Sequence, residues 1–469
     1  MNTLRFQKMD GTTVALERSE IQNALSGEII EPSSDKYDEA RALWNAMINK
    51  SPSLILRVKD EQAVIKAVNF ARMHGILLAI KSGGHNIAGK ALADGGLVID
   101  FHAMNTVTVN AKEKIVKVGP GATLADVDKA TGQHSMLVPT GINSTTGIAG
   151  LTLGGGFGWT TRKFGLTIDS LRSAKLVTAA GDLLTVNAQQ HSDLFWAIRG
   201  GGSNFGIVTE FEFNLHQGGP EVLAGMVVHP FADVKNVLQE YQTAINDAPD
   251  ELSCWVVMRK APPLPFLPDE WHGKEVVILA MCYLGNIAQG QQATQTLRKI
   301  GKPIADVVGP MLFVDWQAAF DPLLTEGARN YWKSLDLAEV NTETVTEIQK
   351  AVLTLPSNEC EIFLAHLGGA MTKIATGDTP WLNREAHYTM NVHTRWQDSQ
   401  DDEKCTHWAQ ELHTNLTQYS MGSVYVNFIP DGDDKSISQA YGSNFARLKS
   451  IKQRVDPSNL FRVNQNIEP

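Results

Sequence analysis

The sequence predicts a mixed α+β protein with more than one domain. Its 469 residues exceed what a single hydrophobic core usually supports. A strand, a helix and a second strand follow one another over residues 54–80, as in a βαβ unit. Between residues 254 and 393, apolar runs of strand length are separated by helical segments, which is typical of an antiparallel sheet with helices on one face. The fold class is therefore α+β, with the antiparallel sheet in a domain of its own.

The first half of the chain predicts short strands and helices. Asp60 is a suitable N-cap for a helix, and Gly75 is placed to end it. Gly181-Asp182 separates two β-rich arms, which predicts a hairpin over 174–186. The other predicted elements are helices over 38–49, 124–130 and 193–198 and strands over 54–58, 76–80, 97–99, 106–109, 115–118 and 207–213.

Gly218-Gly219-Pro220 indicates a boundary, after which longer helices accompany the strands. A proline-rich loop over 262–268 joins two predicted neighbouring strands. The predicted strands are 254–258, 276–280, 361–367, 386–393 and one at Tyr425, and the predicted helices are 287–300, 342–353, one through Leu412 and 440–455.

Composition and charge favour a small-molecule partner. Hydrophobic residues make up 43% of the chain, and the formal net charge is −10. A chain of this charge lacks the basic surface that nucleic acid requires. The four cysteines lie far apart without the spacing of metal ligands, so we expect reduced thiols and no metal site.

The sequence predicts no membrane partner. Its first ten residues lack the apolar core of a secretory signal, and eighteen apolar residues nowhere stand in succession. We therefore expect a cytoplasmic protein. The sequence does not indicate the oligomeric state.

A glycine-rich turn over residues 81–89 follows the predicted strand 76–80. Glycines just past a strand let several backbone N–H groups point one way, which suits a phosphate group. Gly84 to Lys90 spells G-x-x-x-x-G-K, but Ala91 follows where a P-loop needs a hydroxyl, and G-x-G-x-x-G is absent from this region. His85 lies in the turn, and a single histidine taken by itself is usually an ordinary surface or core residue.

Five segments in a fixed order carry a resemblance to a known family. They are Ser82-Gly83-Gly84-His85-Asn86, Gly147-Ile148-Ala149-Gly150-Leu151-Thr152-Leu153-Gly154-Gly155-Gly156-Phe157-Gly158, Arg199-Gly200-Gly201-Gly202-Ser203-Asn204-Phe205-Gly206-Ile207-Val208-Thr209, Tyr425-Val426-Asn427-Phe428 and Asp456-Pro457-Ser458-Asn459-Leu460-Phe461. Each segment alone is weak evidence of a relationship, but the five together span most of the chain. The sequence resembles the FAD-linked oxidoreductases of the berberine bridge enzyme-like group, within the vanillyl-alcohol oxidase superfamily.

The resemblance implies a domain layout. Residues 1–216 together with 420–469 would form a PCMH-type FAD-binding domain of two α/β subdomains. Residues 217–419 would form the substrate-binding domain, an antiparallel sheet covered by helices. Residues 420–469 correspond to the berberine bridge enzyme-like C-terminal segment, which returns to the flavin domain.

The resemblance also implies an activity. The family oxidises an alcohol, sugar or secondary-metabolite C–OH or C–H group by hydride transfer to flavin N5, and O₂ or another acceptor takes the electrons. Two other functions stay open. One is a flavin-binding protein with a non-redox or cyclisation role, and the other is a nucleotide-binding module without flavin.

In the family, a histidine in the position of His85 is bonded to the 8α-methyl of FAD. A neutral imidazole nitrogen can attack that carbon once oxidised flavin has lost a proton from it. Many relatives add a cysteine bond to flavin C6, but Asn143 stands there and has no thiol, so the resemblance implies a single covalent bond. The residues expected at the cofactor are Ser82, Gly83, Gly84, His85, Asn86, Ile87, Thr140, Gly141, Thr145, Thr146, Gly147, Ala149, Gly150, Gly154, Gly155, Gly158, Ile207, Val208, Tyr425 and Asn427.

The candidate catalytic bases are Tyr425, His366 and Lys373. By resemblance, Tyr425 and Asn427 would point from one strand face to the flavin, so Tyr425 could take the alcohol proton. The alternative is that Tyr425 only packs against the ring as an aromatic wall. Lys373 stands near where berberine bridge enzymes carry a catalytic Glu, which argues against berberine-type chemistry. His366 and Lys373 could equally be ordinary strand or loop-end residues.

Overall fold

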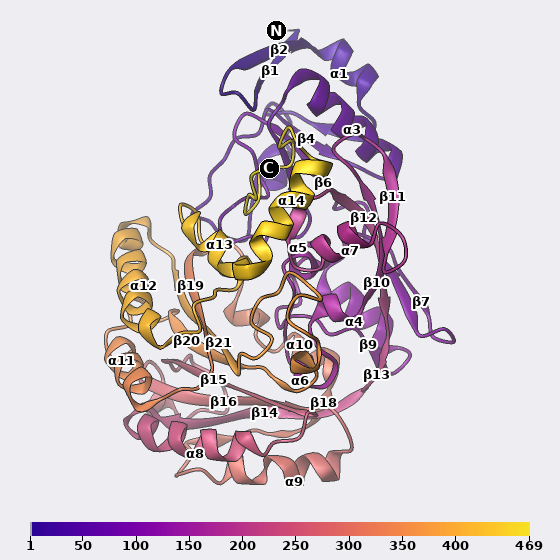
Figure 1. Ribbon diagram of the computed structural model, residues 1–469. Coiled ribbons are helices and arrows are strands. Elements are labelled where there is room, and N and C mark those ends of the chain that lie inside the picture. Colours follow the sequence, from indigo (N-terminus) through magenta and orange to yellow (C-terminus); the bar gives the residue numbers. More distant parts are fainter. Residues whose placement is uncertain (1) are drawn as a thin grey trace.

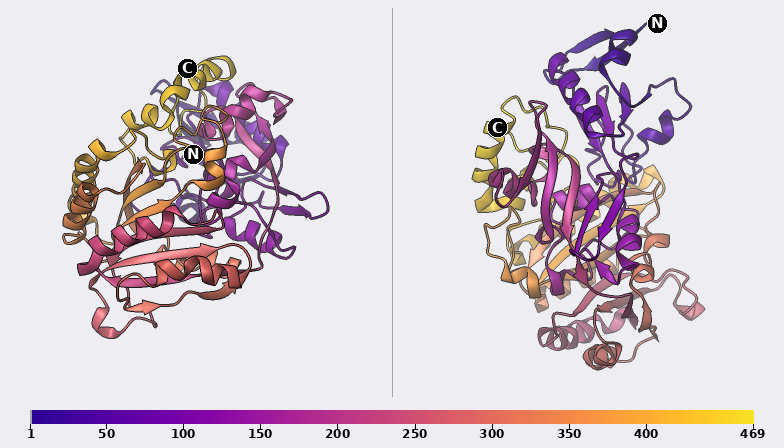
Figure 2. Two further views of the ribbon diagram at one scale, coloured as in Figure 1. Left: turned by 60° about the horizontal axis from the view of Figure 1, so that its bottom comes forward. Right: turned by 90° about the vertical axis from the view of Figure 1, so that its right-hand side faces the viewer.

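The structure is a computed structural model that describes residues 2–469. Helices and sheets are mixed throughout, which confirms the predicted α+β class. The N-terminal part lies at one end of an elongated molecule, and a large sheet with its helices lies at the other (Figure 1). A second antiparallel sheet stands between these two ends, as the side view of Figure 2 shows.

The N-terminal part contains a sheet of order β3-β4-β6-β5, in which β4, β6 and β5 run parallel. The helix α3 connects β4 to β5. Asp60 caps α3 by accepting a hydrogen bond from the Ala63 N–H, and Gly75 ends it with a left-handed φ of 66°. The elements are β1 (Thr3–Gln7), β2 (Thr13–Glu17), α1 (Arg18–Ala24), β3 (Glu28–Ile30), α2 (Tyr37–Arg41), β4 (Leu54–Arg57), α3 (Glu61–His74), β5 (Leu78–Lys81) and β6 (Leu97–Asp100).

The second sheet has the order β11-β10-β12-β8-β7 with antiparallel neighbours. The predicted hairpin around Gly181-Asp182 is confirmed as β10 and β11. The elements are β7 (Val107–Asn110), β8 (Ile115–Val118), α4 (Leu124–Gly132), β9 (Met136–Leu137), α5 (Ile148–Leu153), α6 (Thr161–Phe164), β10 (Leu171–Val177), β11 (Leu183–Asn187), α7 (Ser192–Ile198), β12 (Ile207–Asn214) and β13 (His216–Gln217).

The large sheet has the order β17-β14-β16-β15-β20-β21-β19, with β18 also paired to β14. The predicted pairing of 254–258 with 276–280 is confirmed in β15 and β16. The elements are β14 (Glu221–Pro230), α8 (Val234–Asn246), β15 (Leu252–Lys260), β16 (Glu275–Tyr283), α9 (Ile287–Arg298), β17 (Ala305–Asp306), β18 (Gly309–Leu312), α10 (Phe313–Gln317), β19 (Arg329–Leu337), α11 (Thr342–Val352), β20 (Glu361–His366), β21 (Tyr388–Trp396) and α12 (Asp402–Leu416).

Alternate residues of the large sheet belong to two different environments. On β15, Cys254, Val256 and Met258 join a core with the helices α8, α9, α11 and α12. Their neighbours Trp255 and Val257 point to the opposite face, because successive side chains of a strand alternate. That face is turned toward the rest of the molecule, so the helices lie on the outside, as Figure 1 shows.

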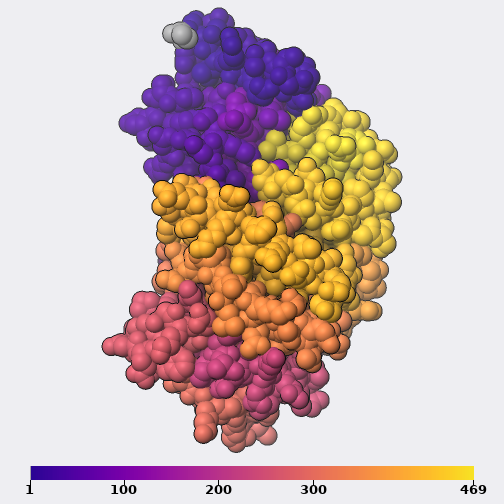
Figure 3. Space-filling model, turned by 90° about the vertical axis from the view of Figure 1, so that its left-hand side faces the viewer, coloured from indigo at the N-terminus to yellow at the C-terminus, as the bar shows by residue number. Residues whose placement is uncertain are grey.

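The C-terminal segment returns from the large sheet to the N-terminal half of the molecule. It contains a 3₁₀ turn, η9 (Val426–Phe428), and the helices α13 (Lys435–Tyr441) and α14 (Phe445–Val455). Figure 3 shows this segment in yellow against the indigo N-terminal part. Lys452 anchors it: its ammonium contacts Asp456 at 2.7 Å and donates to the carbonyl of Asn204 at 2.9 Å.

Two predicted helices were wrong in extent. The helix predicted over 38–49 ends as α2 at Arg41, because the chain turns there and the Lys81 ammonium binds the carbonyls of Ala40 and Ala42. The helix predicted over 440–455 is interrupted at Gly442, whose φ of 46° lies in the left-handed region.

The strand predicted at Tyr425 was also wrong. Residues Val426–Phe428 form the 3₁₀ turn η9. The Tyr425 N–H donates to the Ser334 side chain, so it does not take part in a strand ladder. The turn nevertheless brings the Tyr425 and Asn427 side chains together, with 2.8 Å between the hydroxyl and Nδ2.

The buried Lys452–Asp456 pair predicts a large loss of stability in Lys452→Met. Both side chains are fully buried, and removing the ammonium leaves an uncompensated carboxylate. We expect the free energy of unfolding to fall by about 3–5 kcal/mol, measured by urea denaturation. Lys449→Met, at an exposed position of the same helix, is the control and should change it little. Equal stability of the two variants would contradict the anchoring role.

Candidate active site

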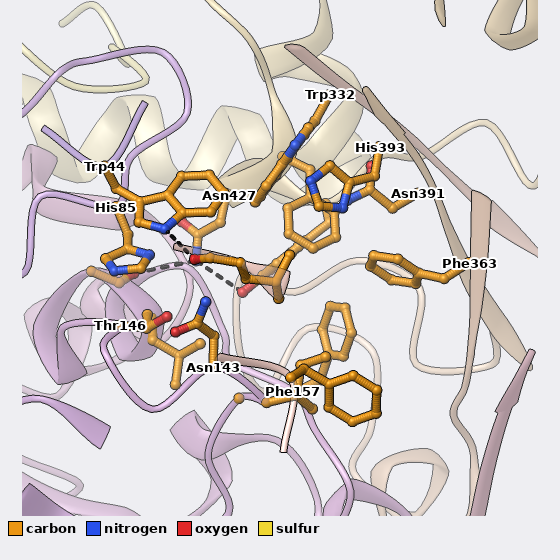
Figure 4. Close-up of a pocket in the computed structure, with 18 of the residues that line it drawn as sticks. Trp44, His85, Asn143, Thr146, Phe157, Trp332, Phe363, Asn391, His393 and Asn427 are labelled. Carbon is orange, nitrogen blue, oxygen red and sulfur yellow. Dashed lines mark hydrogen bonds between the residues drawn. The ribbon is translucent and has the colours of Figure 1, made fainter. Parts of the chain in front are cut away.

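A cavity of about 450 Å³ lies between the glycine-rich segments and the inner face of the large sheet. Backbone and side chains of 82–86, 141–154 and 425–428 form one side, and residues of β14, β15, β16, β20 and β21 form the other. Figure 4 shows His85, Asn143 and Thr146 on the first side and Asn391, His393 and Phe363 on the second.

Most of the predicted cofactor residues meet at this cavity. Those that line it are Ser82, Gly83, Gly84, His85, Asn86, Gly141, Thr146, Gly147, Ala149, Gly150, Gly154, Tyr425 and Asn427. The others, Ile87, Thr140, Thr145, Gly155, Gly158, Ile207 and Val208, are not among the described residues that line it. Ile207 and Val208 instead belong to hydrophobic cores on β12.

Two glycine segments touch each other at the edge of the cavity. A Cβ on Gly83 would lie 2.4 Å from the Gly147 nitrogen, and a Cβ on Gly147 would lie 2.4 Å from the Gly83 nitrogen. Side chains at either position would push the segments apart. A Cβ on Gly150 would meet no atom within 4 Å, although Gly150 lines the cavity. This flat backbone wall fits a planar ring such as that of FAD.

His85 is held on two sides. Its ring stacks on Trp44, with 5.3 Å between the centroids and 20° between the planes. Its Nε2 lies 3.0 Å from the Thr145 hydroxyl. Burial lowers the pKa of His85 to about 4, so the imidazole is neutral at physiological pH. A neutral imidazole is a nucleophile, which suits a bond to the cofactor.

The Tyr425 hydroxyl receives two hydrogen bonds. Asn427 Nδ2 donates to it at 2.8 Å and the Gly156 N–H at 3.3 Å. Burial raises the pKa of Tyr425 to about 12, while these two donors oppose the rise because they stabilise the phenolate. Tyr425 also contacts Phe157, with ring centroids 5.0 Å apart. Tyr425 is thus part of an aromatic wall, and its hydroxyl faces two donors that would stabilise its deprotonated form.

The other two candidate bases lie elsewhere. His366 is buried on β20 beside Arg162, at 3.2 Å from its guanidinium, and burial together with that charge holds the pKa of His366 well below its usual range. Lys373 is exposed and pairs with Asp250 at 2.8 Å. Neither is among the described residues that line the cavity.

The sequence prediction missed a buried polar group on the inner face of the large sheet. The Arg259 guanidinium contacts Glu361 at 2.6 Å, and His393 Nδ1 lies 3.2 Å from the same carboxylate. Burial by itself would raise the pKa of Glu361, but Arg259 and His393 outweigh it and lower the pKa to about 2. All three residues line the cavity. A sequence signal was present on β21, where Asn391 and His393 stand two positions apart and therefore share one face of the strand.

Aromatic side chains make up much of the remaining wall. Trp159 and Trp255 lie with ring centroids 4.6 Å apart, and Trp255 stacks on Phe363 at 5.8 Å. The other aromatic residues that line the cavity are Trp44, Phe157, Phe266, Phe320, Trp332 and Phe428. The part of the cavity next to the sheet is thus apolar apart from Asn391 and the charged group around Glu361.

Comparison with known proteins identifies the family. Residues 52–187 match the FAD binding domain family, and residues 424–468 match the berberine and berberine-like family. The chain is 32% identical to an FAD-linked oxidoreductase of Dictyostelium discoideum, over 99% of this chain and 98% of that protein. The chain belongs to the berberine bridge enzyme-like FAD-linked oxidoreductases.

Further relatives agree with this membership. The chain is 27% identical to (R)-6-hydroxynicotine oxidase of Paenarthrobacter nicotinovorans, over 95% of this chain and 97% of that protein. The crystal structure of 6-hydroxy-D-nicotine oxidase from Arthrobacter nicotinovorans superposes with a TM-score of 0.85 at 26% identity, covering 95% of this chain and 98% of that one. This berberine bridge enzyme-like protein is therefore an FAD-dependent oxidoreductase with the predicted PCMH-type fold.

The residues matched by the two family models overlap with the lining of the cavity. The FAD-binding family match contains the turn of His85 and the backbone wall up to Gly158, and the C-terminal match contains Tyr425 and Asn427.

In residues 2–469, no helix has the length and apolar character needed to cross a bilayer.

The charged group around Glu361 predicts a pH-dependent contribution to stability. Its pKa falls from 4.5 to about 2 on folding, so the carboxylate stabilises the fold above about pH 4.5 and loses this effect as the pH falls toward 2. Glu361→Gln should therefore be less stable than wild type at neutral pH, with a difference that shrinks in acid. Urea midpoints at both pH values measure it. Glu411→Gln, at an exposed position of α12, should show no such difference.

Proposed function

We propose that the protein carries FAD through a single covalent bond from His85 to the 8α-methyl, and that it oxidises a small molecule at a C–OH or C–H group. O₂ or another acceptor takes the electrons. The observation that carries the proposal is the neutral, stacked His85 at the edge of a cavity that a glycine backbone keeps flat. The absence of a thiol at Asn143 supports a single bond.

Different residues of the chain would have different roles around bound FAD. Bound FAD would supply the hydride acceptor, and covalent attachment would fix its ring and raise its reduction potential. The backbone at Gly83, Gly147 and Gly150 would lie against the ring. Asn427 Nδ2 also donates to the Gly150 carbonyl at 3.2 Å, so it links this wall to Tyr425.

We propose Tyr425 as the group that takes the substrate proton. Tyr425 lines the cavity. Asn427 Nδ2 and the Gly156 N–H both donate to its oxygen, so these two hydrogen bonds would stabilise the phenolate. His366 and Lys373 are weaker candidates because each is engaged away from the cavity. The Glu361–His393 pair faces the cavity from the opposite side and would contact the far end of a substrate.

We further propose the domain layout that the resemblance implies, with residues 1–216 and 420–469 holding the flavin and residues 217–419 holding the substrate. Contacts between distant segments support it. Asn204 Nδ2 donates to the Gln465 carbonyl at 3.0 Å, which joins the C-terminal segment to the first half. The four buried, free cysteines suit a reducing compartment, so we propose the cytoplasm as the location.

Acid denaturation tests the covalent bond. We expect wild-type protein to stay yellow and fluorescent, with an intact mass that includes one FAD, because the bond survives unfolding. His85→Ala should release its flavin under the same treatment. His134→Ala, an exposed histidine, should keep it. Free FAD from wild type, or a flavin peptide that contains cysteine, would overturn this part of the proposal.

Tyr425→Phe tests the base. The variant keeps the ring and removes the proton acceptor, so flavin should bind normally while its anaerobic reduction by substrate slows roughly 10²–10⁴-fold. Because the pKa of Tyr425 is about 12, the wild-type rate should rise with pH through the neutral and mildly alkaline range. The variant should lose that rise. Stopped-flow absorbance measures both effects.

Tyr441→Phe is the matched control for this experiment. Tyr441 is buried, lies outside the residues that line the cavity, and its hydroxyl has no partner among the described residues. Its removal should leave flavin reduction unchanged. A loss below about tenfold in Tyr425→Phe would make the residue an aromatic wall only.

A further inference from the structure

We propose that Asn143 and Thr145 position His85 for attachment of the flavin, by fixing its proton on Nε2 and leaving the lone pair of Nδ1 as the nucleophile. The inference rests on the proposed covalent bond and deepens it. It gives a role to Asn143 and Thr145 that neither the sequence nor the comparisons assign.

The direction of each hydrogen bond in this group follows from the geometry. The Thr145 N–H lies 3.1 Å from Asn143 Oδ1, and the Thr145 hydroxyl lies 2.7 Å from the same oxygen. A backbone N–H can only donate, so the Asn143 atom facing Thr145 is its carbonyl oxygen. The hydroxyl hydrogen of Thr145 therefore also points to Asn143.

This arrangement determines the tautomer of His85. A threonine hydroxyl has one hydrogen, which Thr145 gives to Asn143, so its oxygen can only accept from His85. The Nε2 atom, 3.0 Å away, must therefore carry the ring proton. The low pKa of His85 leaves the ring with one proton only. Nδ1 thus keeps its lone pair.

The surroundings hold this nitrogen in place. Trp44 stacks on the imidazole and fixes the plane of the ring, while Thr145 fixes its rotation within that plane. His85, Trp44 and Asn143 all line the cavity. Figure 4 shows Trp44 beside His85, with Asn143 on the same side of the cavity. The group is thus built around the edge at which the flavin would be attached.

The attachment step balances as follows. A C–H bond of the 8α-methyl breaks and a bond from that carbon to Nδ1 forms. The proton of the broken bond passes to water, its electron pair reduces the flavin ring by two electrons, and the reduced ring takes up protons from water. Substituted Nδ1 gives the imidazole a positive charge, which it loses by releasing the Nε2 proton past Thr145 to water. Dioxygen then reoxidises the flavin and is reduced to hydrogen peroxide.

Thr145 and Asn143 favour this step because positive charge develops on the imidazole. A hydrogen bond from Nε2–H to the Thr145 oxygen, itself bonded to the Asn143 carbonyl, stabilises that charge. A hydrogen bond to a charged group typically accounts for a factor of roughly 10–100 in rate. The two residues do not react with the flavin, so they are positioning residues.

The test follows covalent attachment in the full-length chain. Protein from a riboflavin-starved host is mixed with FAD, and samples denatured over time are analysed by in-gel flavin fluorescence and intact mass. Thr145→Val and Asn143→Leu should slow attachment roughly 10- to 100-fold. Thr145→Ser keeps the hydroxyl and should attach near the wild-type rate. Thr414→Val, at an exposed position of α12, controls for the loss of a threonine.

The linked nitrogen provides a second readout. NMR of the flavin peptide from ¹⁵N-histidine-labelled protein distinguishes the two ring nitrogens. Wild type should be linked through Nδ1, whereas Thr145→Val should yield a mixture because its tautomer is no longer fixed. A wild-type link through Nε2 would overturn the inference, as would equal slowing in Thr145→Ser and Thr145→Val.

The outcomes separate the inference from the proposal beneath it. If wild type releases all its FAD on denaturation, the covalent bond itself is absent and both fail. If wild type attaches FAD through His85 and Thr145→Val and Asn143→Leu attach it equally fast, only the positioning role fails. FAD binding is followed separately by the quenching of tryptophan fluorescence. If Thr145→Val and Asn143→Leu bind FAD as tightly as wild type but attach it slowly, the positioning role is supported, because the variants then affect attachment and not affinity.

Discussion

The site depends on one close contact between two glycine segments. Gly83 and Gly147 lie so near each other that a Cβ on either would come within 2.4 Å of the other's backbone nitrogen. This contact sets the turn of His85 beside the loop of Asn143 and Thr145, and the hydrogen bond between His85 and Thr145 spans the junction. A side chain at the contact would separate the segments and move the imidazole away from its partner. The backbone wall, the histidine and its positioning residues are therefore parts of one arrangement.

The large sheet completes the cavity because its two faces have different partners. One face packs on the helices α8, α9, α11 and α12 and forms a hydrophobic core with them. The other face presents Arg259, Glu361 and His393 to the cavity. A charged group of this kind is costly to bury unless each member is paired, and here the carboxylate has both a guanidinium and an imidazole as partners. Because successive side chains of a β-strand point to opposite faces, the same strands contribute to the outer hydrophobic core and to the polar wall of the cavity.

Local signals predicted the elements that depend on local interactions. The capped helix α3 and the hairpin of β10 and β11 formed where the sequence placed their caps and turn. The segments after Arg41 and around Tyr425 did not follow their local pattern, because partners distant in the chain decided them. The Lys81 ammonium donates hydrogen bonds to the carbonyls at the end of α2, and the Ser334 hydroxyl accepts a hydrogen bond from the Tyr425 N–H. The periodicity of apolar residues within one segment does not reveal contacts with residues that are distant in the chain.

The sequence by itself determined the α+β class, the family and the position of His85, since these rest on segments that can be compared residue by residue. Only the tertiary structure decided which side chains share the cavity. It brought Tyr425 to the glycine wall, left His366 and Lys373 outside the lining, and placed the Arg259, Glu361 and His393 group opposite. The physical reason is that these residues come from strands and turns far apart in the chain. Their meeting depends on strand order and on which sheet face is covered, which no single stretch of sequence specifies.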